Sequence, residues 1–141
     1  MYLPKFLDNY TQFNYIISMP HKKILIVDDD QYIRELYVEI LTDEKFDVDS
    51  AEDGIEGVDK IMKNKYDLIL LDIMMPRLDG LGVLQKLHDK KYVNGTIVLL
   101  TNLSHGPVID EGTKLGAKGY LIKADITPDQ FVEKVRSYLK K

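Results

Sequence analysis

Residues 68–80, which read LILLDIMMPRLDG, decide the fold of this chain. The stretch from Tyr66 to Leu71 is apolar except at Asp67, as is typical of a strand buried on both faces of a parallel sheet. The run ends in a carboxylate, Asp72, and Met-Met-Pro follows directly. An acid at the end of a buried strand is costly unless another group pairs with it or uses it. The rest of the chain should therefore supply the groups that do so.

Short apolar runs alternate with helical patterns on both sides of this strand. The last helix has the clearest start, because Thr127 suits the N-cap, Pro128 the first helical position and Gln130 the capping box. Five strands that alternate with five helices predict an α/β fold, a doubly wound parallel sheet with helices on both faces. The predicted strands are 23–27, 46–51, 66–72, 96–101 and 119–123, and the predicted helices are 31–41, 54–62, 81–87, 106–116 and 128–139.

The composition excludes several classes of protein. The length of 141 residues suits one domain with a single core, and the net charge of -4 disfavours a nucleic-acid-binding surface. The chain has no cysteine, which excludes disulfides, thiolate catalysis and cysteine metal sites. No apolar stretch approaches the ~18 residues of a membrane helix, and the first residues lack the pattern of a signal peptide. We therefore expect a cytoplasmic protein that binds neither nucleic acid nor membrane.

Residues 1–20 precede the alternating pattern, and we treat them as an N-terminal extension to a domain at 21–141. Four aromatic residues fall at helical spacing in this extension, which is compatible with a docking helix: Tyr2, Phe6, Tyr10 and Phe13. A disordered tail, or a natural start at Met19, is the alternative. Both interpretations remain open.

Polar residues follow the predicted strands at their carboxyl ends, which share one edge of a parallel sheet. Ligands bind beyond this edge in open α/β sheets. Clustered carboxylates need a cation, and an all-oxygen site suits Mg²⁺, which together with an ammonium group would neutralise a transferring phosphoryl group. A strand-end carboxylate is then the natural nucleophile, so the sequence predicts phosphoryl transfer to Asp72. The residues at the strand ends are Asp28, Asp29 and Asp30 after the first strand, Asp72, Thr101 and Lys123.

The same residues carry a resemblance to a known family. Asp28-Asp29, LLDIMMPRLDG (70–80), Thr101 and GAKGYLIK (116–123), in this order, resemble the receiver domain of two-component response regulators. The resemblance covers residues 22–140. It implies a flavodoxin-like sheet with strand order 2-1-3-4-5, and a signalling protein rather than an enzyme. Because the chain stops soon after its last helix, we expect a stand-alone receiver.

The resemblance also implies how the site is used. Asp72 would be the phosphoacceptor, taking its phosphoryl group from a sensor histidine kinase or a phosphotransfer protein. Asp29, Asp72 and the backbone carbonyl of Met74 would bind Mg²⁺ directly, with Mn²⁺ as a possible substitute. Asp28 would act largely through water bound to the metal. These expectations make the reaction dependent on a divalent cation.

Three further residues would respond to phosphorylation. Thr101 and Lys123 would stabilise the phosphoryl group, and Thr101 would draw Tyr120 inward as a switch. The surface formed by the helix at 106–116, the strand at 119–123 and the last helix would then change its affinity for a downstream protein.

The chain departs from the family's usual pattern at a few positions. Ala124 stands where the family usually has proline, and Asn102 is larger than the small residue favoured there. Met74 and Leu103 are apolar and cannot orient an attacking water, which predicts slow dephosphorylation. A receiver-like binding module that is not phosphorylated remains the alternative function.

Overall fold

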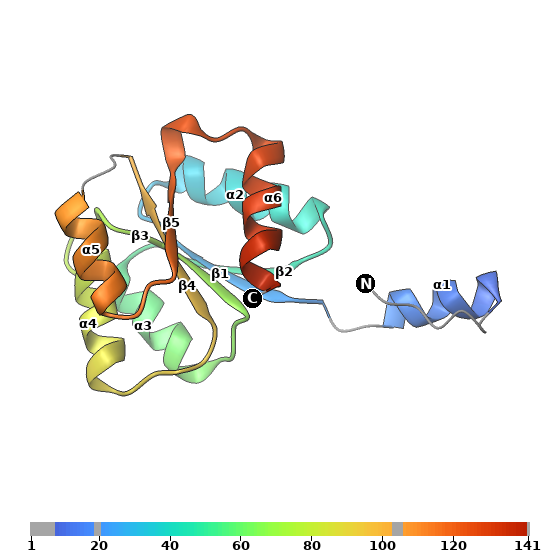
Figure 1. Cartoon of the computed structure of the whole chain (residues 1–141), viewed down its shortest axis with the longest axis horizontal. Helices are drawn as coiled ribbons and strands as arrows, with labels where there is room; N and C mark the ends of the chain where they lie inside the picture. The colour runs from blue at the N-terminus through green and yellow to red at the C-terminus, as the bar shows by residue number, and fades with distance from the viewer. Residues whose placement is uncertain (1–7, 19–20, 103–105, 141) are drawn as a thin grey trace.

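The computed structural model describes residues 8–18, 21–102 and 106–140 (Figure 1). Strands and helices alternate after residue 20, as the sequence predicts. None of the described helices is long and apolar enough to cross a membrane. The strands are β1 (Lys23–Val27), β2 (Asp47–Ala51), β3 (Leu68–Asp72), β4 (Thr96–Thr101) and β5 (Gly119–Ile122). The helices are α1 (Asn9–Ser18), α2 (Gln31–Asp43), α3 (Gly54–Lys63), α4 (Gly80–Asp89), α5 (Gly106–Lys114) and α6 (Pro128–Leu139), with a short 3-10 helix, η1 (Lys123–Asp125).

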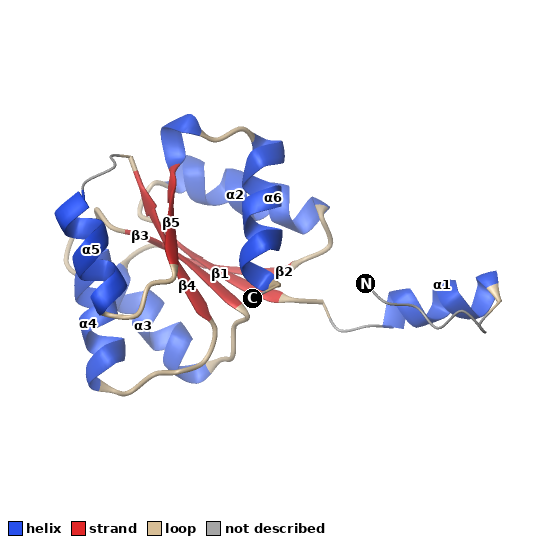
Figure 2. Cartoon of the chain, in the orientation of Figure 1, coloured by secondary structure: helices blue, strands red, loops and turns tan. Residues whose placement is uncertain are grey.

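The five strands form one sheet in the order β2-β1-β3-β4-β5. Every neighbouring pair of strands is parallel. Helices α2 and α6 cover one face of the sheet, and α3, α4 and α5 cover the other (Figure 2). The predicted doubly wound α/β fold with strand order 2-1-3-4-5 is therefore confirmed.

The sheet has a hydrophobic core on each of its faces, and strand β3 contributes side chains to both. Every residue of β3 is buried. Its side chains alternate between the faces of the sheet. Leu68 and Leu70 lie in the core beneath α2 and α6, whereas Ile69 and Leu71 lie in the core beneath α3 and α4. Burying one leucine side chain contributes about 1.5–3 kcal/mol. The apolar run at 68–71 thus holds the centre of the sheet and brings Asp72 to its edge.

Three strands are shorter than the sequence predicts, and of these β2 begins at Asp47 rather than at residue 46. Strand β3 begins at Leu68, and Tyr66 lies buried ahead of it with its hydroxyl donating to Asp49 Oδ2 at 2.7 Å. Strand β5 ends at Ile122, because Lys123 opens the 3-10 helix η1. The observed boundaries thus differ from the apolar pattern by one or two residues.

Side-chain caps start the helices at the edge where the strands end. The Asp30 carboxylate accepts from the backbone N–H of Ile33 at 3.1 Å and so caps the start of α2. Thr127 and Gln130 form the predicted capping box of α6, each side chain accepting from the other's backbone N–H.

Helix α1 lies apart from the sheet and its covering helices in Figure 1. Tyr10 and Phe13, on this helix, are 76% and 60% exposed. Tyr2 and Phe6 lie outside the described residues. The division of the chain at residue 20 stays a prediction.

Candidate functional site

Three carboxylates converge at the carboxyl edge of the sheet. Asp28 directly follows β1, Asp72 ends β3, and these strands are neighbours in the sheet. Asp29 lies beside them, and one oxygen from each of the three groups falls within 4.8 Å of the others. Asp28 and Asp72 are buried, whereas Asp29 is exposed. The structure therefore brings together the acidic residues that the sequence predicts.

Lys123 supplies a cation to this cluster from the start of η1. Its Nζ lies 2.7 Å from Asp28 Oδ2 and 3.3 Å from Asp72 Oδ2. Only 7% of the Lys123 side chain is exposed, so the ammonium group is shared between two buried carboxylates. The Lys123–Ala124 peptide bond is trans, and the lysine reaches both partners without the proline usual in the resembled family.

The proximity of these charges changes their proton affinities. Burial, followed by the charge of Asp28, raises the pKa of Asp72 to about 7, although Lys123 and the Met74 N–H act in the opposite direction. Burial alone would lower the pKa of Lys123, but the Asp28 and Asp72 carboxylates outweigh it and raise that pKa. The lysine therefore stays charged at neutral pH. Its single positive charge faces the carboxylates of Asp28, Asp29 and Asp72.

The donor set fits a small divalent cation. All of the side-chain donors are carboxylate oxygens, which are the ligands that Mg²⁺ prefers. Burial and the neighbouring Asp28 charge together raise the pKa of Asp72, although the Lys123 ammonium group lowers it. A divalent cation beside the three carboxylates would also lower this pKa. The cluster thus resembles the magnesium site of receiver domains.

The remaining predicted site residues lie on β4, on β5 and in the loop after β3. Thr101 is buried at the end of β4, the strand that neighbours β3. The backbone N–H of Met74 donates to Asp72 Oδ1 at 3.2 Å, while the Met74 side chain is exposed. Tyr120 is partly exposed on β5. Leu103, which bears on the dephosphorylation prediction, lies outside the described residues.

Two arginine contacts at the site were not predicted. Arg34 Nη1 donates to the backbone carbonyl of Asp28 at 2.8 Å, from one turn inside α2. Arg77, in the loop after Asp72, forms an ion pair with Asp53 at the start of α3. The sequence signal for the Arg34 contact was a basic residue one turn into the helix that follows Asp28. No sequence pattern pairs Arg77 with Asp53, which lie 24 residues apart.

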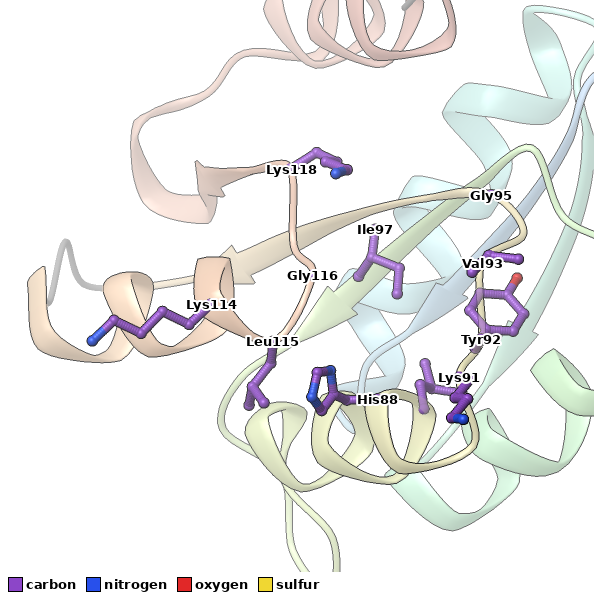
Figure 3. Close-up of a pocket in the computed structure, with 11 residues that line it drawn as sticks. His88, Lys91, Tyr92, Val93, Gly95, Ile97, Lys114, Leu115, Gly116 and Lys118 are labelled. Carbon is purple, nitrogen blue, oxygen red and sulfur yellow. The ribbon is translucent and has the colours of Figure 1, made fainter.

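A separate hollow of about 450 Å³ lies at the opposite edge of the sheet, beside the start of β4 (Figure 3). Its apolar floor includes Ile97 and Leu115, and His88 and Lys114 are on its rim. These two basic residues lie in the last turns of α4 and α5, where cations stabilise the helix dipole. Lys91 and Lys118 also line this hollow, and both lie outside the helices.

Comparisons with known proteins agree with this geometry. The profile of the family described as "Response regulator receiver domain" matches residues 24–136. The chain is 37% identical over 123 residues to the probable transcriptional regulator ycf27 of Porphyridium aerugineum, covering 87% of this chain and 50% of that protein. It is 34% identical over 123 residues to the chemotaxis protein CheY of Treponema pallidum, covering 84% and 83%. The chain spans about half the length of the curated transcriptional regulators that it matches.

Solved structures show the same arrangement of strands and helices. The chemotaxis protein CheY4 of Vibrio cholerae superposes with a TM-score of 0.78 at 28% identity, covering 84% of this chain and 99% of that one. The response regulator TrrA of Thermotoga maritima, in complex with Mg(2+)-BeF, superposes with a TM-score of 0.72 at 39% identity, covering 83% and 98%. A relative of similar sequence has thus been crystallised with a magnesium complex.

Proposed function

The chain belongs to the family of response regulator receiver domains of two-component signalling, and on that basis we propose that Asp72 is its phosphoacceptor. A carboxylate oxygen of Asp72 forms a bond to the phosphorus of a phosphohistidine as the bond from phosphorus to nitrogen breaks. The electron pair of that bond stays on the imidazole nitrogen, which is protonated from the solvent. The product is an acyl phosphate on Asp72.

The position of Asp72 carries this proposal. Its carboxylate ends a fully buried strand, 3.3 Å from Lys123 and next to two further carboxylates, at the edge where ligands bind in open α/β sheets. Lys123 keeps its proton through the reaction, because the neighbouring carboxylates raise its pKa. Its ammonium group therefore remains available to pair with the oxygens of the incoming phosphoryl group.

Four groups of this chain would hold a divalent cation. They are the carboxylates of Asp28, Asp29 and Asp72 and the backbone carbonyl of Met74, and Mg²⁺ or Mn²⁺ suits such an oxygen set. When bound, the cation neutralises the negative charge that develops on the phosphoryl oxygens. The contact between the Met74 N–H and Asp72 Oδ1 meanwhile holds the acceptor carboxylate in one orientation.

The switch that we propose begins at Thr101. Its hydroxyl, at the buried end of β4, hydrogen-bonds a phosphoryl oxygen after transfer. Tyr120, now partly exposed on β5, moves inward as Thr101 shifts. The surface of α5, β5 and α6 then binds a downstream protein differently, as a population shift between two states.

Receiver domains interact with histidine kinases and downstream effectors. For this chain we propose a sensor histidine kinase or a phosphotransfer protein as the donor, in the cytoplasm. The downstream partner is a protein that contacts the surface of α5, β5 and α6.

Intact mass spectrometry tests the central proposal. The protein is incubated with Mg²⁺ and acetyl phosphate, and we expect a gain of one phosphoryl group that is lost in Asp72→Asn. The matched control is Asp59→Asn, which alters an exposed carboxylate on α3 that pairs with Lys63, and it should be phosphorylated like the wild type. No gain from acetyl phosphate or from any phosphohistidine donor would instead support the binding module that is not phosphorylated.

A further inference from the structure

The loop between β3 and α4, residues 73–79, is attached to the site at its base. The N–H of Gly80 donates to the carbonyl of Ile73 at 2.9 Å, which closes the loop where α4 begins. The N–H of Ile73 donates to the carbonyl of Leu100 at 3.1 Å. Met74 follows, with its N–H on Asp72 Oδ1. The conformation of this loop therefore sets the position of the Met74 peptide relative to the phosphoacceptor.

The part of the loop around Arg77 is held by the start of α3. Arg77 Nη2 pairs with Asp53 Oδ2, and the Asp53 side chain is only 9% exposed. The other oxygen of Asp53 accepts from the N–H of Glu56 at 2.8 Å and so caps α3. Because both oxygens are engaged, Asp53 cannot turn away from the loop without uncapping the helix.

The backbone of the loop is under strain at the same place. Arg77 has φ of 66°, in the left-handed region that a residue with a side chain rarely adopts. Such a conformation persists where the surroundings enforce it. The next carbonyl, that of Leu78, rests against Gly54 so closely that a Cβ there would lie 2.2 Å from its oxygen. The loop thus contacts the start of α3 in two ways, through the ion pair of Arg77 with Asp53 and through the Leu78 carbonyl against Gly54.

We infer that Arg77 is a positioning residue, which acts through Asp53 to hold the Met74 peptide against Asp72. The inference rests on the proposed function, since it concerns the same site. Without the ion pair, the loop is no longer fixed to Asp53 at the start of α3, and the Met74 N–H and carbonyl lose their fixed relation to Asp72. Contacts that orient metal-binding groups from outside typically change metal affinity or activity by about 10- to 100-fold.

Variants at position 77 separate the ion pair from the backbone strain. Arg77→Gln removes the charge, whereas Arg77→Gly removes the charge and also accepts the left-handed backbone without strain. Asp53→Asn keeps a helix-capping residue but removes the negative partner. The matched control is Lys63→Gln, which removes an exposed ion pair of 2.9 Å with Asp59 on the same helix.

Two measurements report on the site without requiring phosphorylation. They are hydrogen exchange at the Met74 amide by NMR in metal-free protein, and the Mg²⁺ dissociation constant by titration calorimetry. We expect Arg77→Gln, Arg77→Gly and Asp53→Asn each to speed exchange and to weaken Mg²⁺ binding by about 10-fold. The Arg77→Gln, Asp53→Asn double variant should be no weaker than the single variants, because both changes remove one interaction. The control should match the wild type.

Either of two results overturns the inference. One is wild-type exchange and Mg²⁺ affinity in Arg77→Gln. The other is wild-type exchange and Mg²⁺ affinity in Arg77→Gly while Arg77→Gln is impaired. That result would assign the effect to the backbone conformation at position 77 and not to the ion pair. A wild-type protein that takes up no phosphoryl group would overturn the proposed function instead, and the exchange rates at Met74 would still decide whether Arg77 holds the loop.

Discussion

Lys123 and Asp28 form an enclosed ion pair, with Nζ 2.7 Å from Oδ2 and the two side chains 7% and 0% exposed. The residues come from opposite ends of the domain, since Asp28 follows the first strand of the sheet and Lys123 the last. A charge that is enclosed in this way depends on its partner, because removal of one member leaves the other charge buried and unpaired.

Removal of the Lys123 ammonium group should therefore destabilise the fold. In Lys123→Met we expect the free energy of unfolding to fall by about 3 kcal/mol, because two buried carboxylates lose their cation. Urea denaturation in metal-free buffer measures this change. Lys63→Met, which breaks an exposed ion pair, should change the same quantity by less than about 1 kcal/mol. If the free energy of unfolding fell equally in the two variants, the Lys123 ion pairs would contribute no more than an exposed pair, which would contradict the prediction.

Stability without metal should decrease as the pH rises through about 7. The pKa of Asp72 is raised in the folded protein from 3.8 to about 7, so the folded state binds this proton more tightly than the unfolded state. The resulting stabilisation is complete below about pH 3.8 and is lost as the pH passes about 7. Thermal unfolding between about pH 6 and pH 8, in the presence of a chelator, tests this. Asp72→Asn should lose this part of the pH dependence, and an unchanged slope in that variant would assign it to another group.

Mg²⁺ should stabilise the folded protein through the acidic cluster. At a free concentration 100 times the dissociation constant, we expect a gain of about 2.7 kcal/mol in the free energy of unfolding. Asp29→Ala, which removes the exposed member of the cluster, should reduce this gain. Asp30→Asn is the control, because it changes the adjacent carboxylate while keeping a residue that caps α2. If Asp30→Asn lost as much of the gain as Asp29→Ala, the cation would not lie at the proposed cluster.

Met74→Asn should shorten the lifetime of the phosphorylated protein. The Met74 side chain is exposed beside Asp72 and has no group that orients a water molecule. An amide there can hydrogen-bond an attacking water, and we expect dephosphorylation to accelerate by roughly 10-fold through this positioning. The decay of the phosphorylated mass after removal of the donor gives the rate. Met62→Asn, an exposed methionine on α3, serves as the control and should decay like the wild type.

The residues of the candidate site were largely predictable, but their pairing was not. Asp28, Asp29, Asp72 and Lys123 could be named because the carboxyl ends of parallel strands share one edge. That Lys123 lies closer to Asp28 than to Asp72 depends on the turn of η1 after β5. Packing sets this turn, and packing does not appear in a hydrophobic pattern.

Sequence was sufficient for the alternation of strands and helices, for the buried character of β3 and for the capping box of α6, because each follows from residues close together along the chain. Tertiary structure was needed for the interactions between distant residues. The raised pKa of Asp72 requires the burial and the neighbouring charges that only the folded chain supplies. The ion pair of Arg77 with Asp53 requires the β3–α4 loop to meet the start of α3, and no local signal encodes that meeting. Local preferences thus specify which elements form, whereas the electrostatics of the site arise from how those elements pack.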